Sequence, residues 1–214
     1  AKLATEADNA PESLRLMRLA HSLDPATVDE MPKLAGALYL AGAMAEALPL
    51  PRALASTVSF HDAPDVAERV WLRLADLAQQ QGDVALAEST LRRVVSERPL
   101  NGAAVEKLSA LVSAREPRAG FELRARWAET LSKSPRTAAL LVELAREANT
   151  THHDLAAAAR LFSKAAEASD EPLAVRLELT TLLRTAGRVG ELMTELQEVA
   201  QLQLTSGDVE GALA

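Results

Sequence analysis

Residues 68–99 have the sequence ERVWLRLADLAQQQGDVALAESTLRRVVSERP, and this stretch decides the fold. Apolar side chains recur at three- and four-residue spacing on both sides of a Gly-Asp dipeptide, as they do along one face of an α-helix. Gly82 can adopt the positive φ that ends the first helix, and the carboxylate of Asp83 can cap the second. Pro99 closes the second helix because its ring fixes φ and disfavours helix in the preceding residue. The stretch predicts two antiparallel helices joined by a tight turn.

This helix pair resembles the tetratricopeptide repeat (TPR), a unit of about 34 residues with the pattern W-x2-L-G-x2-Y, then A-x3-F, then P. Ala78 departs from the pattern, because it stands where the family has Tyr. The resemblance rests on Trp71, Leu74, Ala75, Ala87, Leu91 and Pro99.

The unit recurs along the chain, which predicts one helical-repeat array over residues 1–214. Ala158 and Phe162 keep the A-x3-F element in a later copy, and the turn glycines Gly82 and Gly187 lie close to three periods apart. Pro135 and Pro172 are expected to close second helices. We expect irregular repeats at 1–63, regular repeats at 64–100, 101–135, 136–172 and 173–200, and a truncated end at 201–214.

The composition predicts an all-α fold. Hydrophobic residues make up 48% of the chain, most of them Ala and Leu, while aromatic residues make up only 3%. β-Branched residues are too scattered to form the alternating runs that strands need. The TPR resemblance further implies an α-α superhelix, a right-handed solenoid of antiparallel helix pairs. Small residues such as Ala145 and Ala158 would let the helix axes approach closely.

Charge and hydropathy argue against two classes of partner. The net charge of -7 disfavours nucleic acid and anionic membrane surfaces. Phe121 and Trp127 lie in an Arg-rich stretch and could in principle stack on bases, but both fall on the expected core stripe of a helix. No run of 18 apolar residues is present, so we expect no membrane insertion.

The sequence offers no candidate for chemistry. The chain has no cysteine, which excludes disulfides, thiol catalysis and sulfur-bound zinc. His152 and His153 would point about 100° apart on a helix and cannot both face one metal, so we expect an exposed turn in which Asp154 caps the next helix. Two carboxylate pairs, Glu143 with Glu147 and Glu191 with Glu195, fit a solvated helix face. We expect no enzyme, no metal site and no cofactor.

The resemblance implies where a partner would bind. In TPR proteins the first helices line a concave wall, and a partner helix or peptide lies within it. The chain lacks the Lys and Asn residues with which some members grip a terminal carboxylate. Carried over by position, the tentative groove residues are Arg69, Leu72, Asp76, Gln79, Gln80, Glu106, Val142, Arg146, Asn149, Leu177, Thr181 and Arg184.

The expected function is therefore that of a protein-interaction scaffold that binds a helix or an extended peptide of another protein in this groove. The alternative is a structural spacer or self-association module without a ligand of its own. The opening AKLATEADNAPES lacks the apolar stretch of a secretion signal, and the ending TSGDVEGALA resembles a helix start. Both ends look like cuts inside a larger, bacterial-type repeat protein. The cytoplasm is favoured, and the periplasm stays open because the chain looks like an internal fragment.

Overall fold

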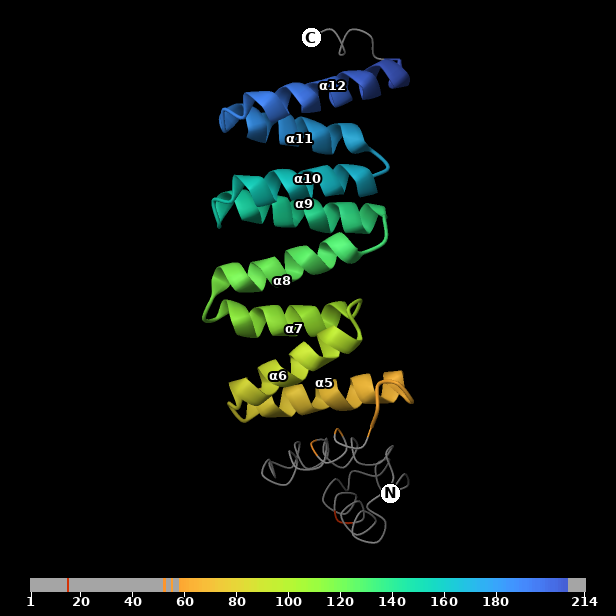
Figure 1. Ribbon diagram of the computed structural model, residues 1–214, viewed down its shortest axis with the longest axis vertical. Helices are drawn as coiled ribbons and strands as arrows, with labels where there is room; N and C mark the ends of the chain where they lie inside the picture. Colours follow the sequence, from red (N-terminus) through yellow and green to blue (C-terminus); the bar gives the residue numbers. More distant parts are fainter. Residues whose placement is uncertain (1–14, 16–51, 53–54, 56–57, 208–214) are drawn as a thin grey trace. The chain divides into compact units, whose positions relative to one another are not determined.

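The computed structural model describes residues 15, 52, 55 and 58–207. This part of the chain contains eight α-helices and no strand, and within α5–α7 and within α8–α12 consecutive helices run in opposite directions (Figure 1). The all-α fold class is confirmed. Nearly all of the irregular repeats expected at 1–63 lie outside the described residues, as do residues 208–214. The helices are α5 (Pro64–Gln80), α6 (Val84–Glu97), α7 (Gly102–Ser113), α8 (Pro117–Thr130), α9 (Pro135–Thr150), α10 (Leu155–Ala168), α11 (Pro172–Thr185) and α12 (Val189–Ser206).

The chain divides into two compact units, Ala1–Val112 and Ser113–Ala214. In the first unit α5 packs against α6, and Val70 and Leu74 belong to a small core against which Trp71 lies half-buried. In the second unit each helix from α8 to α12 contacts the next one along the chain, and α8 also contacts α10. The order of the helices in space thus follows their order in the sequence within the second unit.

Helices α5 and α11 end in the same kind of turn. Gly82 and Gly187 have φ of 76° and 68°, the left-handed region that glycine adopts without a steric penalty. The following amide, of Asp83 or Arg188, donates to the carbonyl five residues earlier, which completes a Schellman motif. Asp83 then accepts a hydrogen bond from the Leu86 amide at 3.0 Å and caps α6. The roles expected for Gly82 and Asp83 are confirmed.

Within residues 58–207, prolines open helices more often than they close them. Pro135 and Pro172 are the first residues of α9 and α11, whereas the preceding helices end earlier, at Thr130 and Ala168. The expectation that these two prolines close second helices was wrong. The first helical position suits proline because its amide would lack an intrahelical partner anyway, and its fixed φ already matches the helix.

Small residues lie where helices meet. Ala145 on α9 and Ala158 and Ala165 on α10 are fully buried, and Phe162 of the A-x3-F element is only 4% exposed. Alanine at such positions lets helix axes approach closely, and little space remains for a larger side chain. The last repeat departs from the expected range, because α12 continues past residue 200 to Ser206 and ends at Gly207, which has φ of 84°.

Candidate partner-binding groove

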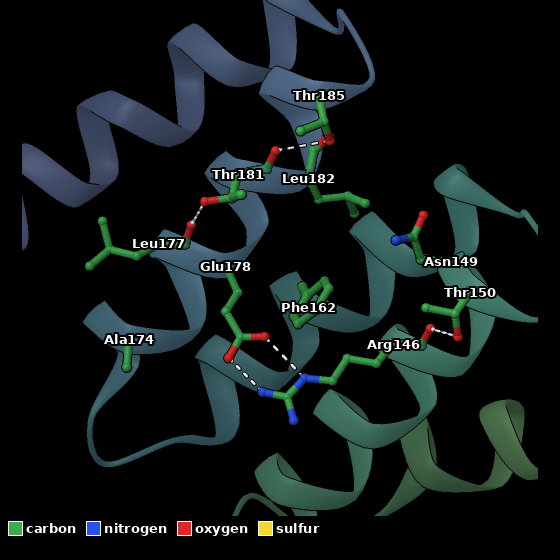
Figure 2. Close-up of a pocket in the computed structure, with 10 residues that line it drawn as sticks. All are labelled: Arg146, Asn149, Thr150, Phe162, Ala174, Leu177, Glu178, Thr181, Leu182 and Thr185. Carbon is green, nitrogen blue, oxygen red and sulfur yellow. Dashed lines mark hydrogen bonds and ion pairs between the residues drawn. The ribbon is translucent and has the colours of Figure 1, made fainter.

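A hollow of about 430 Å³ lies between α9, α10 and α11 in the second unit. Phe162 of α10 lies at its back, with α9 on one side and α11 on the other (Figure 2). Leu177 of α11 lines the hollow and is 44% exposed, a large value for a leucine side chain. The hollow therefore offers apolar surface that water now covers. Its lining consists of Arg146, Asn149, Thr150, Phe162, Ala174, Leu177, Glu178, Thr181, Leu182 and Thr185.

Three threonines border this hollow, and each uses its hydroxyl hydrogen within its own helix. Thr150 donates to the Arg146 carbonyl at 2.8 Å, and Thr181 donates to the Leu177 carbonyl at 2.9 Å. Thr185 donates to the carbonyls of Thr181 and Leu182. A hydroxyl that has donated its hydrogen still has lone pairs that can accept hydrogen bonds. The border of the hollow is thus richer in acceptors than in donors.

The charged pair in the hollow is satisfied internally. The guanidinium of Arg146 donates two hydrogen bonds to the carboxylate of Glu178, from Nε to Oε2 at 3.1 Å and from Nη2 to Oε1 at 2.7 Å (Figure 2). These hydrogen bonds, together with the charge of Glu178, raise the pKa of Arg146 above its ordinary value. Since the two charges neutralise each other, the hollow itself favours neither an acidic nor a basic ligand.

Four of the predicted groove residues line this hollow: Arg146, Asn149, Leu177 and Thr181. Two others in the second unit do not. Val142 of α9 is half-buried against the hydrophobic core, and Arg184 of α11 is exposed outside the lining. Sequence reasoning missed Phe162 as a groove residue because its A-x3-F position marks it only as core.

The predicted groove residues of the first unit do not line this hollow and differ in their exposure. Arg69, Gln79, Gln80 and Glu106 are exposed, and Leu72 and Asp76 are half-buried. Asp76 of α5 accepts a hydrogen bond from the ammonium of Lys107 on α7, and the contact is also an ion pair. These six residues do not line the hollow of the second unit, and their role as partner contacts stays a prediction.

Ion pairs between residues about one repeat length apart in the sequence are a feature that sequence reasoning missed. Arg98 pairs with Glu68 at 2.8 Å across 30 residues, and Arg160 pairs with Glu129 at 2.8 Å across 31. Arg146 and Glu178 are separated by 32 residues. These separations are close to one repeat of about 34 residues. Opposite charges one period apart were the sequence signal that could have revealed them.

The carboxylate pairs are not the solvated faces that we expected. Glu147 accepts a hydrogen bond from Arg124 of α8 at 2.6 Å, and Glu195 of α12 is 8% exposed and bound to Arg176 of α11 at 2.6 Å. The amphipathic pattern could not show this, because a long Arg side chain on a neighbouring helix neutralises each of these carboxylates. Glu191 pairs with Arg188, and Glu143 is exposed as expected.

The His152–His153 turn is confirmed in part. Asp154 caps α10 by accepting from the Ala157 amide at 3.0 Å, and His153 is exposed with φ of 51°. His152 is not exposed: its side chain is 9% accessible and its ring lies 4.6 Å from that of Phe121. Among the described residues, no group of three or more His, Asp or Glu side chains could hold a metal ion.

The aromatic residues considered for base stacking belong to the interior. Phe121 is 3% exposed within the core of the second unit, which confirms its place on the core stripe of α8, and Trp127 is half-buried. In the part of the chain that the structure describes, no helix is both long and apolar enough to cross a lipid bilayer.

The chain is similar to solved helical-repeat structures at low sequence identity. A crystal structure of MamA matches with a TM-score of 0.54 and 14% identity over 77% of this chain and 91% of that chain. A tetratricopeptide repeat protein from Parabacteroides merdae matches with a TM-score of 0.51 and 14% identity over 98% of this chain and 85% of that one. The structure of Naa15/Naa10 bound to HypK-THB matches with a TM-score of 0.57 and 14% identity over 98% of this chain and 34% of its own.

No family model matches the sequence, and no curated protein is significantly similar to it. The evidence for the fold is therefore structural: helix pairs of TPR length, glycine-ended turns, and buried alanines at the positions where the TPR pattern has small residues. The chain has the TPR-like, all-α fold of consecutive antiparallel helix pairs.

Proposed function

We propose that the chain is a protein-interaction scaffold and that the hollow between α9, α10 and α11 binds a helix or an extended segment of another protein. The observation that carries this proposal is the exposed apolar surface of Leu177, which is 44% exposed and borders the hollow, beside the buried ring of Phe162 at its back. Exposed apolar surface inside a concave site is the usual anchor point for an apolar side chain of a partner.

The side chains that line the hollow indicate which kinds of partner residue would bind there. An apolar side chain of the partner fits against Leu177, since binding removes both its own surface and that of Leu177 from water. Asn149 of α9 has an amide that both donates and accepts, and it can bind a peptide group of the partner. Because Arg146 and Glu178 already pair with each other, the partner does not need a charged residue at this position.

Similar structures support the scaffold class. The Naa15/Naa10 structure is bound to HypK-THB, so a protein with a comparable stretch of helix pairs occurs in a complex with other proteins. The likeness is one of fold, and the partner of the present chain would be selected by its own groove residues.

The test compares two leucine variants. Leu177→Ala should weaken partner binding by about 10- to 100-fold, the loss expected when a buried leucine contact of about 1.5–3 kcal/mol is removed. Leu177→Glu should abolish binding because it places a charge against the apolar side chain of the partner. Both variants should fold normally, since Leu177 is 44% exposed in the free protein.

Leu155→Glu is the matched control. Leu155 is also a partly exposed leucine, at 36%, but it is the first residue of α10 and does not line the hollow. Affinity would be measured by titration calorimetry with the partner recovered by affinity capture. Equal binding by the Leu177→Glu variant and the Leu155→Glu variant would contradict the groove proposal.

The structural spacer is the second candidate, and the Arg146–Glu178 pair favours it. A spacer needs ion pairs that join one repeat to the next, and this pair joins α9 to α11. The two functions separate in the same experiment, because a spacer captures no partner whose binding depends on Leu177.

A further inference from the structure

A separate hollow lies in the first unit, where residues 58–61 meet α5 and α6. It encloses about 450 Å³, a volume typical of small ligand sites. Phe60 and Trp71 form its aromatic side, with ring centroids 6.3 Å apart. Val58 lines it as well and packs against the small core of this unit. None of the groove residues predicted from the sequence lines this hollow.

Arg93 of α6 contacts an aromatic ring at this hollow and does not pair with a carboxylate. Its guanidinium carbon lies 4.9 Å from the centroid of the Trp71 ring, within the range of a cation–π interaction. Among the residues that the structure describes, Arg93 has no ion pair and no hydrogen-bond acceptor. The ring thus holds the guanidinium at the hollow while its N–H donors are unused.

Glu97 lies one helical turn further along α6 and also lines the hollow. It has no cationic partner in the described part of the chain, whereas Glu88 and Arg92, at the same spacing on this helix, form an ion pair at 2.5 Å. The order of the charges explains the difference, because at this spacing an acid before a base is more favourable than a base before an acid. The hollow therefore presents one positive and one negative group that are not paired with each other.

These two charges restrict the kind of ligand that fits. A ligand that is only an anion is attracted by Arg93 and repelled by Glu97, and a ligand that is only a cation meets the reverse. A ligand with both charges satisfies both groups. His61 is the remaining titratable side chain of the lining. It is exposed, and its backbone N–H donates to Ser59 Oγ at 3.0 Å, which fixes the turn before α5.

We propose that this hollow binds a zwitterionic ligand in which an apolar group joins a carboxylate and an ammonium. Arg93 binds the carboxylate, Glu97 binds the ammonium, and Phe60 and Val58 contact the apolar group. Two sources have this chemistry: a free amino acid with an apolar side chain, and a protein segment in which a basic and an acidic residue flank an apolar one. The site is in the first unit, so it does not rest on the function proposed for the second.

Three small probes separate the two charged contacts. L-Phenylalanine has both charges, 3-phenylpropionate has only the carboxylate, and phenethylamine has only the ammonium. Binding to the full chain is followed by the fluorescence of Trp71, in a Trp127→Phe background that leaves one tryptophan. Phenylalanine should bind at least about ten-fold more tightly than either of the others, since it alone makes both charge-assisted hydrogen bonds.

Substitutions then assign each contact to a side chain. Glu97→Gln should weaken phenylalanine binding about ten-fold and should not weaken 3-phenylpropionate binding, whereas Arg93→Gln should weaken both. The two variants should fold normally, because both side chains are exposed and neither has an ion pair within the described residues. Arg136→Gln and Glu116→Gln are matched controls that should leave all three affinities unchanged, since both residues are exposed and outside the lining.

A tripeptide of lysine, phenylalanine and glutamate, blocked at both ends, distinguishes the two sources. If it binds more tightly than free phenylalanine, the ligand is a protein segment, and the opposite order identifies a free amino acid. The proposal is overturned if neither probe saturates the Trp71 signal, or if 3-phenylpropionate binds as tightly as phenylalanine. An increase in phenylalanine affinity in the Glu97→Gln variant would equally overturn it, because the site would then prefer a simple anion.

Discussion

At the scale of single residues, two glycines near the start of α12 should respond in opposite ways to substitution by alanine. Gly187 has φ of 68°, and a Cβ added at either Gly187 or Gly190 would meet no neighbouring atom within 4 Å. Gly187→Ala should lower the free energy of unfolding by about 1 kcal/mol, because alanine is strained in the left-handed region. Gly190→Ala should raise it by about 0.5–1 kcal/mol, because alanine loses less entropy in a helix.

Urea unfolding followed by circular dichroism measures both changes. The pair is informative because the two sites are three residues apart and equally free of neighbours, so only the backbone conformation distinguishes them. A loss of stability in both variants would mean that crowding, and not φ, governs this turn.

The predictions from sequence were most accurate for the roles of single residues in turns and caps. Gly82 and Asp83 have the roles that their residue types predict, because a Schellman turn and an N-cap involve atoms only a few residues apart. Sequence reasoning did not predict the conformation of His153, which has a positive φ of 51°. Positive φ is uncommon for every residue except glycine, although His is enriched there, so the sequence alone did not identify the turn residue.

At the scale of helices, the buried alanines set the distances between neighbours. Ala145 on α9 is fully buried, and Ala139 on the same helix is exposed. Ala145→Leu should cost about 1–3 kcal/mol of stability because the added atoms have no space in a packed interface. Ala139→Leu should change stability by less than about 0.5 kcal/mol. Chemical denaturation gives the free energy of unfolding of each variant. A similar loss of stability in both would contradict close packing at Ala145.

Two ion pairs that involve α12 should differ in strength for a reason that only the structure supplies. Arg176 and Glu195 have side chains that are 19% and 11% exposed, whereas those of Arg188 and Glu191 are 46% and 49% exposed. Glu195→Ala should cost about 2–4 kcal/mol, since it removes the close partner of a largely buried guanidinium and leaves it only Glu198, at 3.6 Å. Glu191→Ala should cost less than about 1 kcal/mol.

Salt dependence provides a separate check on these pairs. Adding salt should reduce the small contribution of the exposed Arg188–Glu191 pair and change that of Arg176–Glu195 much less, because buried pairs are screened less. Unfolding of the single and double variants at low and high salt gives both coupling energies. If the coupling energy of the buried pair falls with salt as steeply as that of the exposed pair, the burial argument fails.

At the scale of the whole molecule, the two compact units should respond separately to local damage. The chain has two tryptophans, Trp71 in the first unit and Trp127 in the second. Repeat proteins are stabilised by contacts between neighbours, so a change in one repeat weakens distant repeats less than adjacent ones. Ala145→Leu should shift the urea midpoint seen by Trp127 more than the midpoint seen by Trp71.

Variants that keep one tryptophan each, through Trp71→Phe or Trp127→Phe, isolate the two fluorescence signals. The matched change in the first unit is Ala75→Leu on α5, where Ala75 is 1% exposed, and it should affect mainly the Trp71 signal. Identical shifts at both tryptophans for both substitutions would show that the chain unfolds as one cooperative body.

The sequence by itself determined the helices, the repeat length and the main turns. Each of these depends on contacts between residues a few positions apart: apolar residues at helical spacing, glycine with positive φ, and aspartate at an N-cap. It also placed Arg146, Asn149, Leu177 and Thr181 on helix faces that meet at one hollow. Val142 does not line this hollow but packs partly buried against the core, because the rotation of α9 against its neighbours depends on side-chain packing across helices.

The tertiary structure alone decided which charges pair, which carboxylates are buried, and where apolar surface is left exposed. Arg146 and Glu178 are 32 residues apart, and Arg176 and Glu195 are 19 apart, so their meeting depends on how whole helices stack. The pattern of a single helix contains no information about that stacking distance. Local hydrogen bonding shapes the helices, whereas packing between them creates the hollows and ion pairs on which the proposed binding depends.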